Sequence, residues 1–261
     1  MDLGLRDRVY IVTGGSRGLG RAAAQALLAE GARVVLSARG AEAVDAAARE
    51  LGETAGGADQ VVGVVADNAD PDTAHRLLDT ALTAFGRVDG ALVSVGGPPP
   101  GPVADTPDEV WLDAFGGVFL GALRIARMVG SALAAREGEG SIAFVLSTSV
   151  RQPIPGLGVS NGLRPGLAGA AKALADELGP SGVRVNGLLP GSIATDRLRS
   201  LAAARGEDPE EALARTARGV PLRRVGTPEE FGRVAAFVLS PAASYLTGAQ
   251  IPVDGGVIRG I

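Results

Sequence analysis

Residues 13–20 read TGGSRGLG, and this short stretch decides the fold class of the chain. Its glycines Gly14, Gly18 and Gly20 suit a tight turn that lets the backbone approach a bound group closely. The stretch follows the strand-like run RVYIVT and leads into the alanine-rich run GRAAAQALLAEG, which predicts a helix. A helix N-terminus offers unpaired N–H groups and a positive dipole end, so a glycine turn here predicts a pyrophosphate site.

Beyond this turn, short apolar segments alternate with longer amphipathic ones along the chain. Further helices are expected at 41–52, 72–85 and 107–136. The expected strands are RVYIVT (8–13), VVLSA (34–38), VVGVVA (61–66), ALVSVG (91–96), SIAFVLS (141–147), VRVNGLLP (183–190) and AQIPVDGG (249–256). Strands that are apolar on both faces predict a parallel sheet with helices on both sides. The sequence thus predicts an α/β fold, a single Rossmann-type domain over residues 1–261 with a doubly wound parallel sheet of about seven strands.

A polar segment near residues 195–220 interrupts this alternation. It is rich in Arg, Glu and Ala, with a break expected at GEDPEE (206–211). The segment predicts a helical excursion outside the sheet. It could serve as a lid over a substrate or be a solvated surface hairpin, and the sequence favours neither.

The composition argues against several classes of function. The 261 residues are 46% hydrophobic but only 3% aromatic, so the core must be aliphatic. The net charge of −4 comes without a basic block, which argues against nucleic-acid and membrane partners. Cysteine is absent, so thiolate ligands are excluded, and no metal site is expected. No uninterrupted apolar run approaches the roughly 20 residues of a membrane span, and MDLGLRDRVY does not resemble a signal peptide, so a cytoplasmic location is expected.

The end of the second strand predicts the choice of cofactor. Dinucleotide sites for NAD tend to place an acidic residue there, against the ribose 2′-hydroxyl. This chain instead reads Ser37, Ala38, Arg39, and Arg17 lies inside the glycine turn. Two arginines and no carboxylate favour a 2′-phosphate, so NADP(H) is expected rather than NAD(H). The alternative is that Arg39 is a solvated surface side chain.

Several motifs in order along the chain resemble those of the short-chain dehydrogenase/reductase family. TGGSRGLG resembles its TGxxxGxG loop, and RVNGLLPG, with Asn186, resembles its N-x-x-x-P-G strand end. RRVGTPEE and FVLSPAASYLTGAQIPVDGG match its C-terminal segment, in the branch usually called 3-oxoacyl-acyl-carrier-protein reductase. The resemblance implies a small-molecule substrate and a homo-oligomer, a dimer or tetramer. With the glycine turn and Arg39, it places the cofactor against Gly14, Ser16, Arg17, Gly18, Leu19, Gly20, Arg39, Asp67, Asn68, Gly96, Arg164, Pro190, Gly191, Ile193 and Thr195.

The chain departs from the family where the chemistry is expected. The family uses a tyrosine as proton donor, a lysine four residues later, a serine on the preceding strand end and an asparagine on an earlier helix. An ungapped register anchored at Lys172 places Ser160 at the tyrosine position and Arg164 at the lysine position. Ser147 takes the serine position, 13 residues before Ser160 as is usual in the family, and Val118 takes the asparagine position. Ser147, Ser160 and Arg164 are therefore the candidate catalytic side chains.

Arginine and serine could replace only part of the missing chemistry. Arg164 could hold the nicotinamide ribose and stabilise negative charge on a carbonyl oxygen, but its high pKa makes it no proton donor. Ser160 is a poor acid unaided, although at i and i+4 the two side chains share one helix face. Pro165 disfavours helical geometry at Arg164, so the helix is expected to start late or kink, with the pair in a loop. Alternatively, Ser160 or Asn161 merely caps the helix and Arg164 is a surface residue.

Other residues offer little replacement for the lost proton donor. Tyr10 precedes the glycine turn, Tyr245 belongs to the C-terminal segment, and His75 and Lys172 are expected on helix surfaces. Ser147, Thr148 and Ser149 end the fifth strand, where open α/β sheets bind ligands. The GGPPPG turn (96–101) is either one rigid wall of the substrate pocket or a plain turn.

The leading interpretation is an NADP(H)-dependent oxidoreductase of carbonyl and alcohol substrates with an atypical active site. Ser147 would polarise the carbonyl, helped by Ser160 and Arg164. A cofactor-binding sensor or assembly protein without redox chemistry is the main alternative. A lyase or isomerase that uses the nucleotide structurally is a third.

Overall fold

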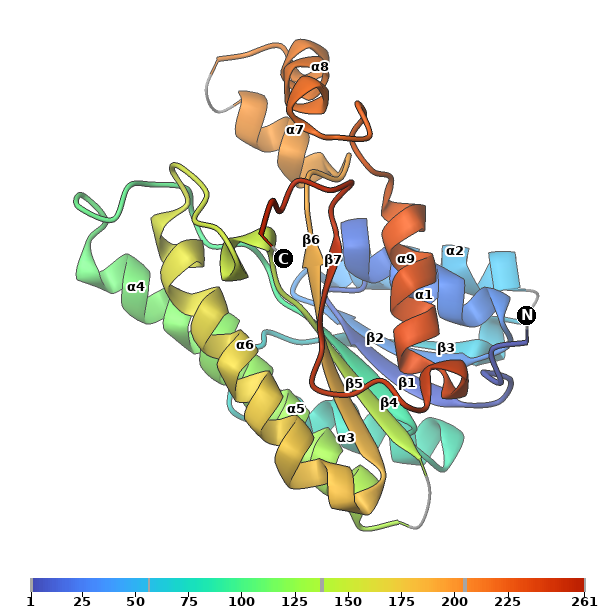
Figure 1. Ribbon diagram of the computed structural model, residues 1–261. Coiled ribbons are helices and arrows are strands. Elements are labelled where there is room, and N and C mark those ends of the chain that lie inside the picture. The colour runs from blue at the N-terminus through green and yellow to red at the C-terminus, as the bar shows by residue number, and fades with distance from the viewer. Residues whose placement is uncertain (1, 56, 137–138, 204–205, 261) are drawn as a thin grey trace.

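A parallel sheet forms the centre of the molecule in the computed structural model, which describes residues 2–55, 57–136, 139–203 and 206–260 (Figure 1). Its strand order is β3-β2-β1-β4-β5-β6-β7, and every neighbouring pair is parallel. The strands are β1 (Val9–Thr13), β2 (Arg33–Ala38), β3 (Val61–Val65), β4 (Gly90–Ser94), β5 (Gly140–Val145), β6 (Val183–Pro190) and β7 (Gln250–Val253). The predicted seven-stranded, doubly wound sheet is confirmed.

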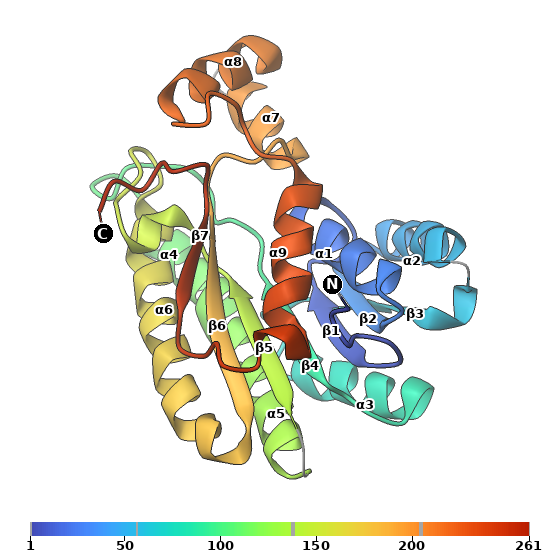
Figure 2. The ribbon, with the colours of Figure 1, turned by 45° about the vertical axis from the view of Figure 1, so that its right-hand side comes forward.

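Helices cover both faces of this sheet (Figure 2). The α-helices are α1 (Gly18–Ala29), α2 (Ala41–Ala55), α3 (Thr73–Phe85), α4 (Asp108–Ala114), α5 (Gly121–Ala134), α6 (Gly158–Leu178), α7 (Asp196–Ala203), α8 (Pro209–Gly219) and α9 (Pro228–Leu239). Helices α1, α2 and α9 pack on one face, and α3, α5 and α6 on the other. Helices α7 and α8 stand beyond the carboxyl end of β6, at the top of Figure 1. Short helical turns are η1 (Ala58–Gln60), η2 (Phe115–Leu120), η3 (Thr148–Val150), η4 (Gly179–Ser181) and η5 (Pro241–Ala243).

Alternation along the strands builds a core on each face. In β1, Val9 and Ile11 belong to the cluster under α3, α5 and α6, while Tyr10 and Val12 belong to the cluster under α1, α2 and α9. Successive strand side chains point to opposite faces, so a central strand must be apolar throughout to supply both clusters. This is why β1 reads VYIVT and is buried at all its positions.

The long helical segment Asp108–Ala134 contains a stretch that is apolar enough, by length and composition alone, to cross a membrane. An 18-residue window within it has a mean hydropathy of 1.4. Arg124 and Arg127 nevertheless interrupt the segment, so it holds no uninterrupted apolar run of about 20 residues, as expected. Its buried residues, among them Ile125 and Val129, pack in the core cluster against the sheet. That packing is what a core helix of an α/β fold requires.

Candidate active site

The glycine turn at the carboxyl end of β1 has the geometry of an anion receptor. Gly14 and Gly18 have φ of 60° and 56°, a left-handed conformation that favours glycine. A Cβ atom on Gly20 would lie 2.3 Å from the carbonyl oxygen of Gly14, so only glycine permits this close turn. Helix α1 begins within this stretch, at Gly18, and its N-cap residue Arg17 makes no side-chain capping bond. The first N–H groups of α1 therefore remain available to a bound anion.

The residues expected to select the cofactor lie beside this turn. The backbone N–H of Gly15 donates to the carbonyl oxygen of Ser37 at 2.9 Å, which ties the turn to the end of β2. Arg39 follows β2 directly, and both Arg39 and Arg17 are exposed. Neither takes part in the ion pairs among the described residues. A dinucleotide with a 2′-phosphate thus fits the chemistry of these side chains.

The expected adenine and nicotinamide contacts lie along the same edge of the sheet. Asp67 is exposed after β3, and its carboxylate accepts from the N–H of Ala69 at 3.0 Å. Thr195, just before α7, lies over the glycine turn, since a Cβ on Gly18 would be 3.6 Å from its methyl carbon. The other residues assigned to the cofactor follow strand ends or open α1: Ser16, Leu19, Asn68, Gly96, Pro190, Gly191 and Ile193. Carboxyl ends of parallel strands meet at one edge, which is where an open α/β sheet binds its ligand.

Serine hydroxyls from β5 and α6 come together beside this edge. Ser147 follows β5 and is partly exposed, and its Oγ accepts from the backbone N–H of Ser149 at 3.1 Å. Its own hydroxyl hydrogen remains free to donate to a carbonyl oxygen. The Oγ atoms of Ser149 and Ser160 lie 3.4 Å apart in a buried contact. Ser149 is thus a neighbour of Ser160 to which the sequence analysis gave no catalytic role.

Arg164 is buried below these serines. Its side chain is 6% exposed, and its Nη1 donates to the carbonyl oxygen of Val145 at 2.7 Å. Burial, with a smaller contribution from the charge of Arg197, lowers the pKa of Arg164 to about 10, so it remains a cation at neutral pH. The alternative that Arg164 is a surface residue is wrong.

The late helix start and the loop expected from Pro165 are also wrong. Helix α6 runs from Gly158 to Leu178 with Pro165 inside it, so Ser160 and Arg164 lie on the helix and not in a loop. Neither Ser160 nor Asn161 caps the helix, whose N-cap is Leu157. The Asn161 side chain instead exchanges two 2.9 Å bonds with the backbone of Ile154, which holds the chain entering α6. Pro165 has no N–H, but the tertiary contacts of α6 outweigh the missing bond.

None of the residues considered as a substitute proton donor presents an available polar group at the carboxyl edge of the sheet. Val118 is buried in the π-helical turn η2 and carries no polar group. Tyr10 is buried on the opposite face of the sheet, where burial raises its pKa and its hydroxyl donates to Leu239 at 3.3 Å. Tyr245 is fully exposed, and His75 is exposed on α3. Lys172 is exposed and pairs with Asp176 at 3.5 Å.

Arg197 is a further charged residue at the site that the sequence analysis did not single out. It lies in α7, and its Nη1 and Nη2 donate to the carbonyl oxygens of Gly97 and Pro98 at 3.0 and 2.9 Å. The GGPPPG turn also pairs with the entry to α6, because Gly101 bonds the backbone of Gly156 and of Gly158. The turn is therefore joined to both α6 and α7, and its role as one wall of the substrate pocket stays a prediction. The only sequence signal for Arg197 was its position two residues after Thr195.

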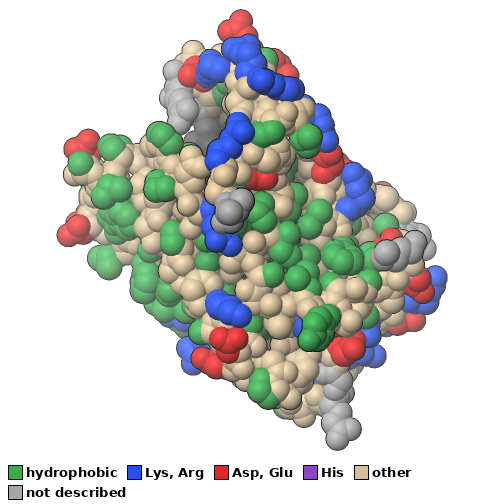
Figure 3. Space-filling model, in the orientation of Figure 1, with side chains coloured by type: hydrophobic (Ala, Val, Ile, Leu, Met, Phe, Trp, Pro, Cys, Tyr) green, Lys and Arg blue, Asp and Glu red, His purple; other side chains and the backbone are tan. Residues whose placement is uncertain are grey.

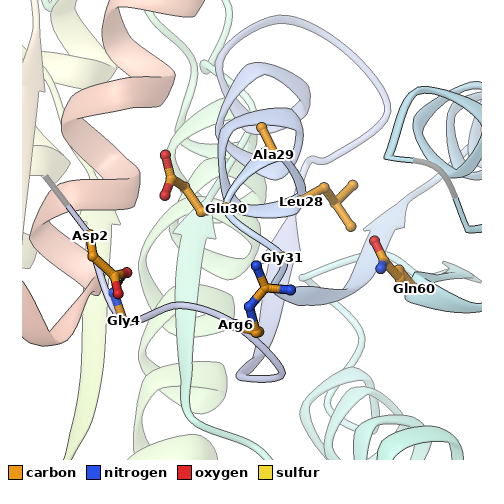
Figure 4. Close-up of a pocket in the computed structure, with 8 residues that line it drawn as sticks. All are labelled: Asp2, Gly4, Arg6, Leu28, Ala29, Glu30, Gly31 and Gln60. Carbon is orange, nitrogen blue, oxygen red and sulfur yellow. Dashed lines mark hydrogen bonds between the residues drawn. The ribbon is translucent and has the colours of Figure 1, made fainter.

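A separate hollow lies at the other end of the sheet (Figure 4). Asp2, Gly4, Arg6, Leu28, Ala29, Glu30, Gly31 and Gln60 line it. These residues precede β1, β2 and β3 or end α1, so they border the amino ends of the strands. The hollow takes no part in the site at the carboxyl ends.

The sheet, the open helix N-terminus and the strand-end residues define a dinucleotide-binding α/β protein. A family described as "Enoyl-(Acyl carrier protein) reductase" matches residues 14–258. Dehydrogenase/reductase SDR family member 4 of Bos taurus is 36% identical over 256 residues, covering 97% of this chain and 88% of that protein. The chain belongs to the short-chain dehydrogenase/reductase family and is an oxidoreductase that uses a nicotinamide cofactor.

Two solved structures are similar over their whole length. L-sorbose reductase from Gluconobacter frateurii, complexed with NADPH and L-sorbose, has a TM-score of 0.93 and 30% identity, covering 100% of both chains. A short-chain oxidoreductase from Pseudomonas aeruginosa, described as containing an atypical catalytic center, has a TM-score of 0.91 and 31% identity, again covering 100% of both. Both likenesses extend to the sheet edge that carries the candidate site.

Proposed function

We propose that the protein is an NADP(H)-dependent oxidoreductase of carbonyl and alcohol substrates with an atypical active site. The observation that carries this is the uncapped N-terminus of α1, which shares one sheet edge with the free hydroxyl of Ser147. Arg39 and Arg17 supply positive charge for a 2′-phosphate where no acidic side chain competes. NADPH in the sorbose reductase and the atypical center of the Pseudomonas protein support the proposal by analogy.

Each side chain has a definite part in this reaction. The cofactor supplies or takes the hydride, and one proton must move to or from the substrate oxygen. Ser147 donates a hydrogen bond to that oxygen, and the Arg164 cation stabilises the negative charge that develops on it. The Ser149–Ser160 hydroxyl pair passes the proton between that oxygen and water. The substrate is a small molecule, and assembly into a dimer or tetramer is expected from the family.

A direct test measures cofactor binding and turnover in one preparation. NADPH is expected to bind more tightly than NADH in a competition titration, because only NADPH carries the 2′-phosphate. A panel of ketones, aldehydes and alcohols, followed by the absorbance of NADPH, is expected to reveal turnover that Ser147→Ala reduces. Tighter binding of NADH would reject the cofactor assignment.

A second candidate function, an NADP(H)-binding sensor or assembly partner without redox chemistry, is favoured by the contacts of Ser160 and Arg164. Ser160 is held against Ser149, and Arg164 is bonded to Val145, so both side chains also support the backbone around them. A protein that binds NADP(H) as a sensor or assembly partner needs no proton donor at this position. Tight NADPH binding without turnover across the whole panel would favour this function.

A further inference from the structure

Two arginine guanidinium groups from different parts of the chain share the carboxyl edge of the sheet. Arg164 enters from α6 beside the end of β5, and Arg197 enters from α7 over the turn after β4. Ser94, three residues before Gly97, pairs with Val145 across β4 and β5, so the two guanidinium groups are bonded to the ends of neighbouring strands. The charge of Arg197 accordingly lowers the pKa of Arg164, after the larger effect of burial. Like charges at such range repel, so this arrangement needs a compensating partner.

The described residues provide no such partner. Neither Arg164 nor Arg197 belongs to any ion pair among the described residues. Their bonds go only to backbone carbonyl oxygens, those of Val145, Gly97 and Pro98. Burial lowers the pKa of Arg197 as well, although this residue is exposed overall, so Arg164 is buried and Arg197 only partly desolvated, both without a counter-charge. A buried cation such as Arg164 is costly without an anion.

Both guanidinium groups retain N–H donors that could serve a ligand. Arg164 uses only Nη1 among the described hydrogen bonds, and none of its nitrogens is sealed from solvent without a partner. Arg197 uses Nη1 and Nη2, which leaves Nε and the remaining hydrogens. Planar guanidinium groups match a carboxylate closely, with two parallel N–H···O bonds.

The place of Arg197 is fixed by the turn that it covers. A Cβ atom on Gly97 would lie 2.2 Å from the guanidinium carbon of Arg197, so the group rests directly on this glycine. Basic and acidic side chains are mixed over α7 and α8 at the top of Figure 3, and Arg199 and Arg215 pair there with Glu210 and Glu207. Arg197 differs from these two arginines because it belongs to none of the ion pairs among the described residues.

We propose that the substrate is a carbonyl compound carrying a carboxylate, or the corresponding hydroxy acid, and that Arg197 binds this carboxylate. This inference rests on the proposed function and names the substrate class of that same site. Ser147 and Arg164 then meet the carbonyl oxygen while Arg197 holds the acid group. The bound carboxylate offsets the repulsion between the two arginines.

The test uses binding to the NADP⁺ complex, in which a ketone cannot be reduced. The probes are 2-oxobutanoate, 3-oxobutanoate and 4-oxopentanoate, each measured beside its neutral primary amide by calorimetry. At least one acid is expected to bind about 10- to 100-fold more tightly than its amide, the range of charge-assisted hydrogen bonds. Equal affinity of every acid and its amide, or no binding of any acid, would overturn the inference.

Variants test whether Arg197 is responsible for the preference for the acid over its amide. Arg197→Gln is expected to remove the preference for the acid and leave the affinity for NADPH unchanged. Arg199→Gln is the matched control, because Arg199 lies two residues further along α7 and faces Glu210 at 3.6 Å. Gly97→Ala keeps both charges but displaces the Arg197 guanidinium, so it should weaken the preference too. An acid preference that survives Arg197→Gln would assign the arginine another role.

Turnover with NADPH separates this inference from the proposed function. Acid preference in binding without any reduction would keep the carboxylate site and reject the oxidoreductase. Reduction of acids and amides with equal kcat/KM would keep the oxidoreductase and reject the carboxylate site. If Arg197→Gln weakens NADPH binding and leaves the acid preference intact, the arginine serves the cofactor and the inference fails.

Discussion

The glycine turn (13–20) and the β5–α6 site (Ser147, Ser149, Ser160 and Arg164) share one sheet edge but differ in how they are built. In the turn, backbone geometry does the work, since Gly14 and Gly18 adopt positive φ and α1 begins uncapped. The β5–α6 site is expected to act through its side chains, and its residues differ from those that the family resemblance implies.

The difference shows which parts of this fold can change. Gly20 cannot be replaced without moving the turn, because the Gly14 carbonyl occupies the place of a Cβ. Ser160 and Arg164 lie within helix α6, whose backbone conformation many residue types can adopt, so their chemistry can be exchanged with less change to the backbone than at Gly20. Function can therefore diverge at α6 while cofactor binding persists.

The largest effect is expected from a substitution that disrupts the glycine turn. Gly20→Ala places a methyl group against the Gly14 carbonyl, so NADPH binding should weaken by about 10²-fold or more and stability should fall by about 1–3 kcal/mol. Fluorescence titration with NADPH and thermal unfolding measure the two effects. Gly169→Ala is the control, because it is also helical but has nothing within 4 Å of the new methyl group. The Gly169→Ala protein should be more stable to unfolding by about 0.5–1 kcal/mol. If Gly20→Ala bound NADPH as tightly as the wild type, the argument that this turn requires glycine would be contradicted.

The next effect concerns the β5–α6 site alone. Ser147→Ala removes the hydroxyl that polarises the carbonyl, so kcat should fall by about 10²-fold while NADPH affinity is retained. Steady-state kinetics on the best substrate of the panel measure this change. Ser131→Ala, on the exposed side of α5, should leave kcat unaltered. An equal loss in both variants would remove Ser147 from the chemistry.

A smaller effect is expected at Arg39, beside the glycine turn. Arg39→Gln removes the cation expected beside the 2′-phosphate, so NADPH affinity should fall about tenfold and NADH affinity should not change. Competition titrations with both nucleotides measure it. Arg49→Gln, an exposed change on α2, provides the control. Equal losses for NADPH and NADH would show that Arg39 does not contact the 2′-phosphate.

The smallest expected effect is a gain in stability. Arg164→Met removes a buried cation without a counter-charge, so the cofactor-free protein should be about 1–2 kcal/mol more stable at neutral pH. The folded-state pKa of about 10 lies below the ordinary value for arginine, so the unfolded chain binds more protons between these two values. Wild-type stability therefore rises through this window, and the advantage of the variant should shrink there. Denaturant unfolding at about pH 8 and about pH 11 measures the difference.

A less stable Arg164→Met protein would give a different account of this residue. The 2.7 Å bond from Arg164 to the Val145 carbonyl would then outweigh the cost of burying the charge. Arg164→Lys provides the matched variant, since it keeps a cation but loses the planar guanidinium group.

Much of the fold was predictable because its signals are local. Strands such as VYIVT are apolar on both faces, and the TGGSRGLG turn carries its geometry in adjacent residues. The positions of Ser147, Ser160 and Arg164 followed from spacing in the chain. The burial of Arg164 and the unbroken helix through Pro165 did not follow, because both depend on what packs around α6.

The sequence by itself determined the parallel sheet, the glycine turn and the arginines beside it, and it predicts that the family's tyrosine and lysine are replaced. Only the tertiary structure decided that Ser149 meets Ser160, and that Arg197 rests on Gly97, a hundred residues away in the chain. Periodicity and spacing report what neighbours along the chain require. Contacts between distant segments depend on where the packed helices α6 and α7 place their side chains, and no local pattern encodes that.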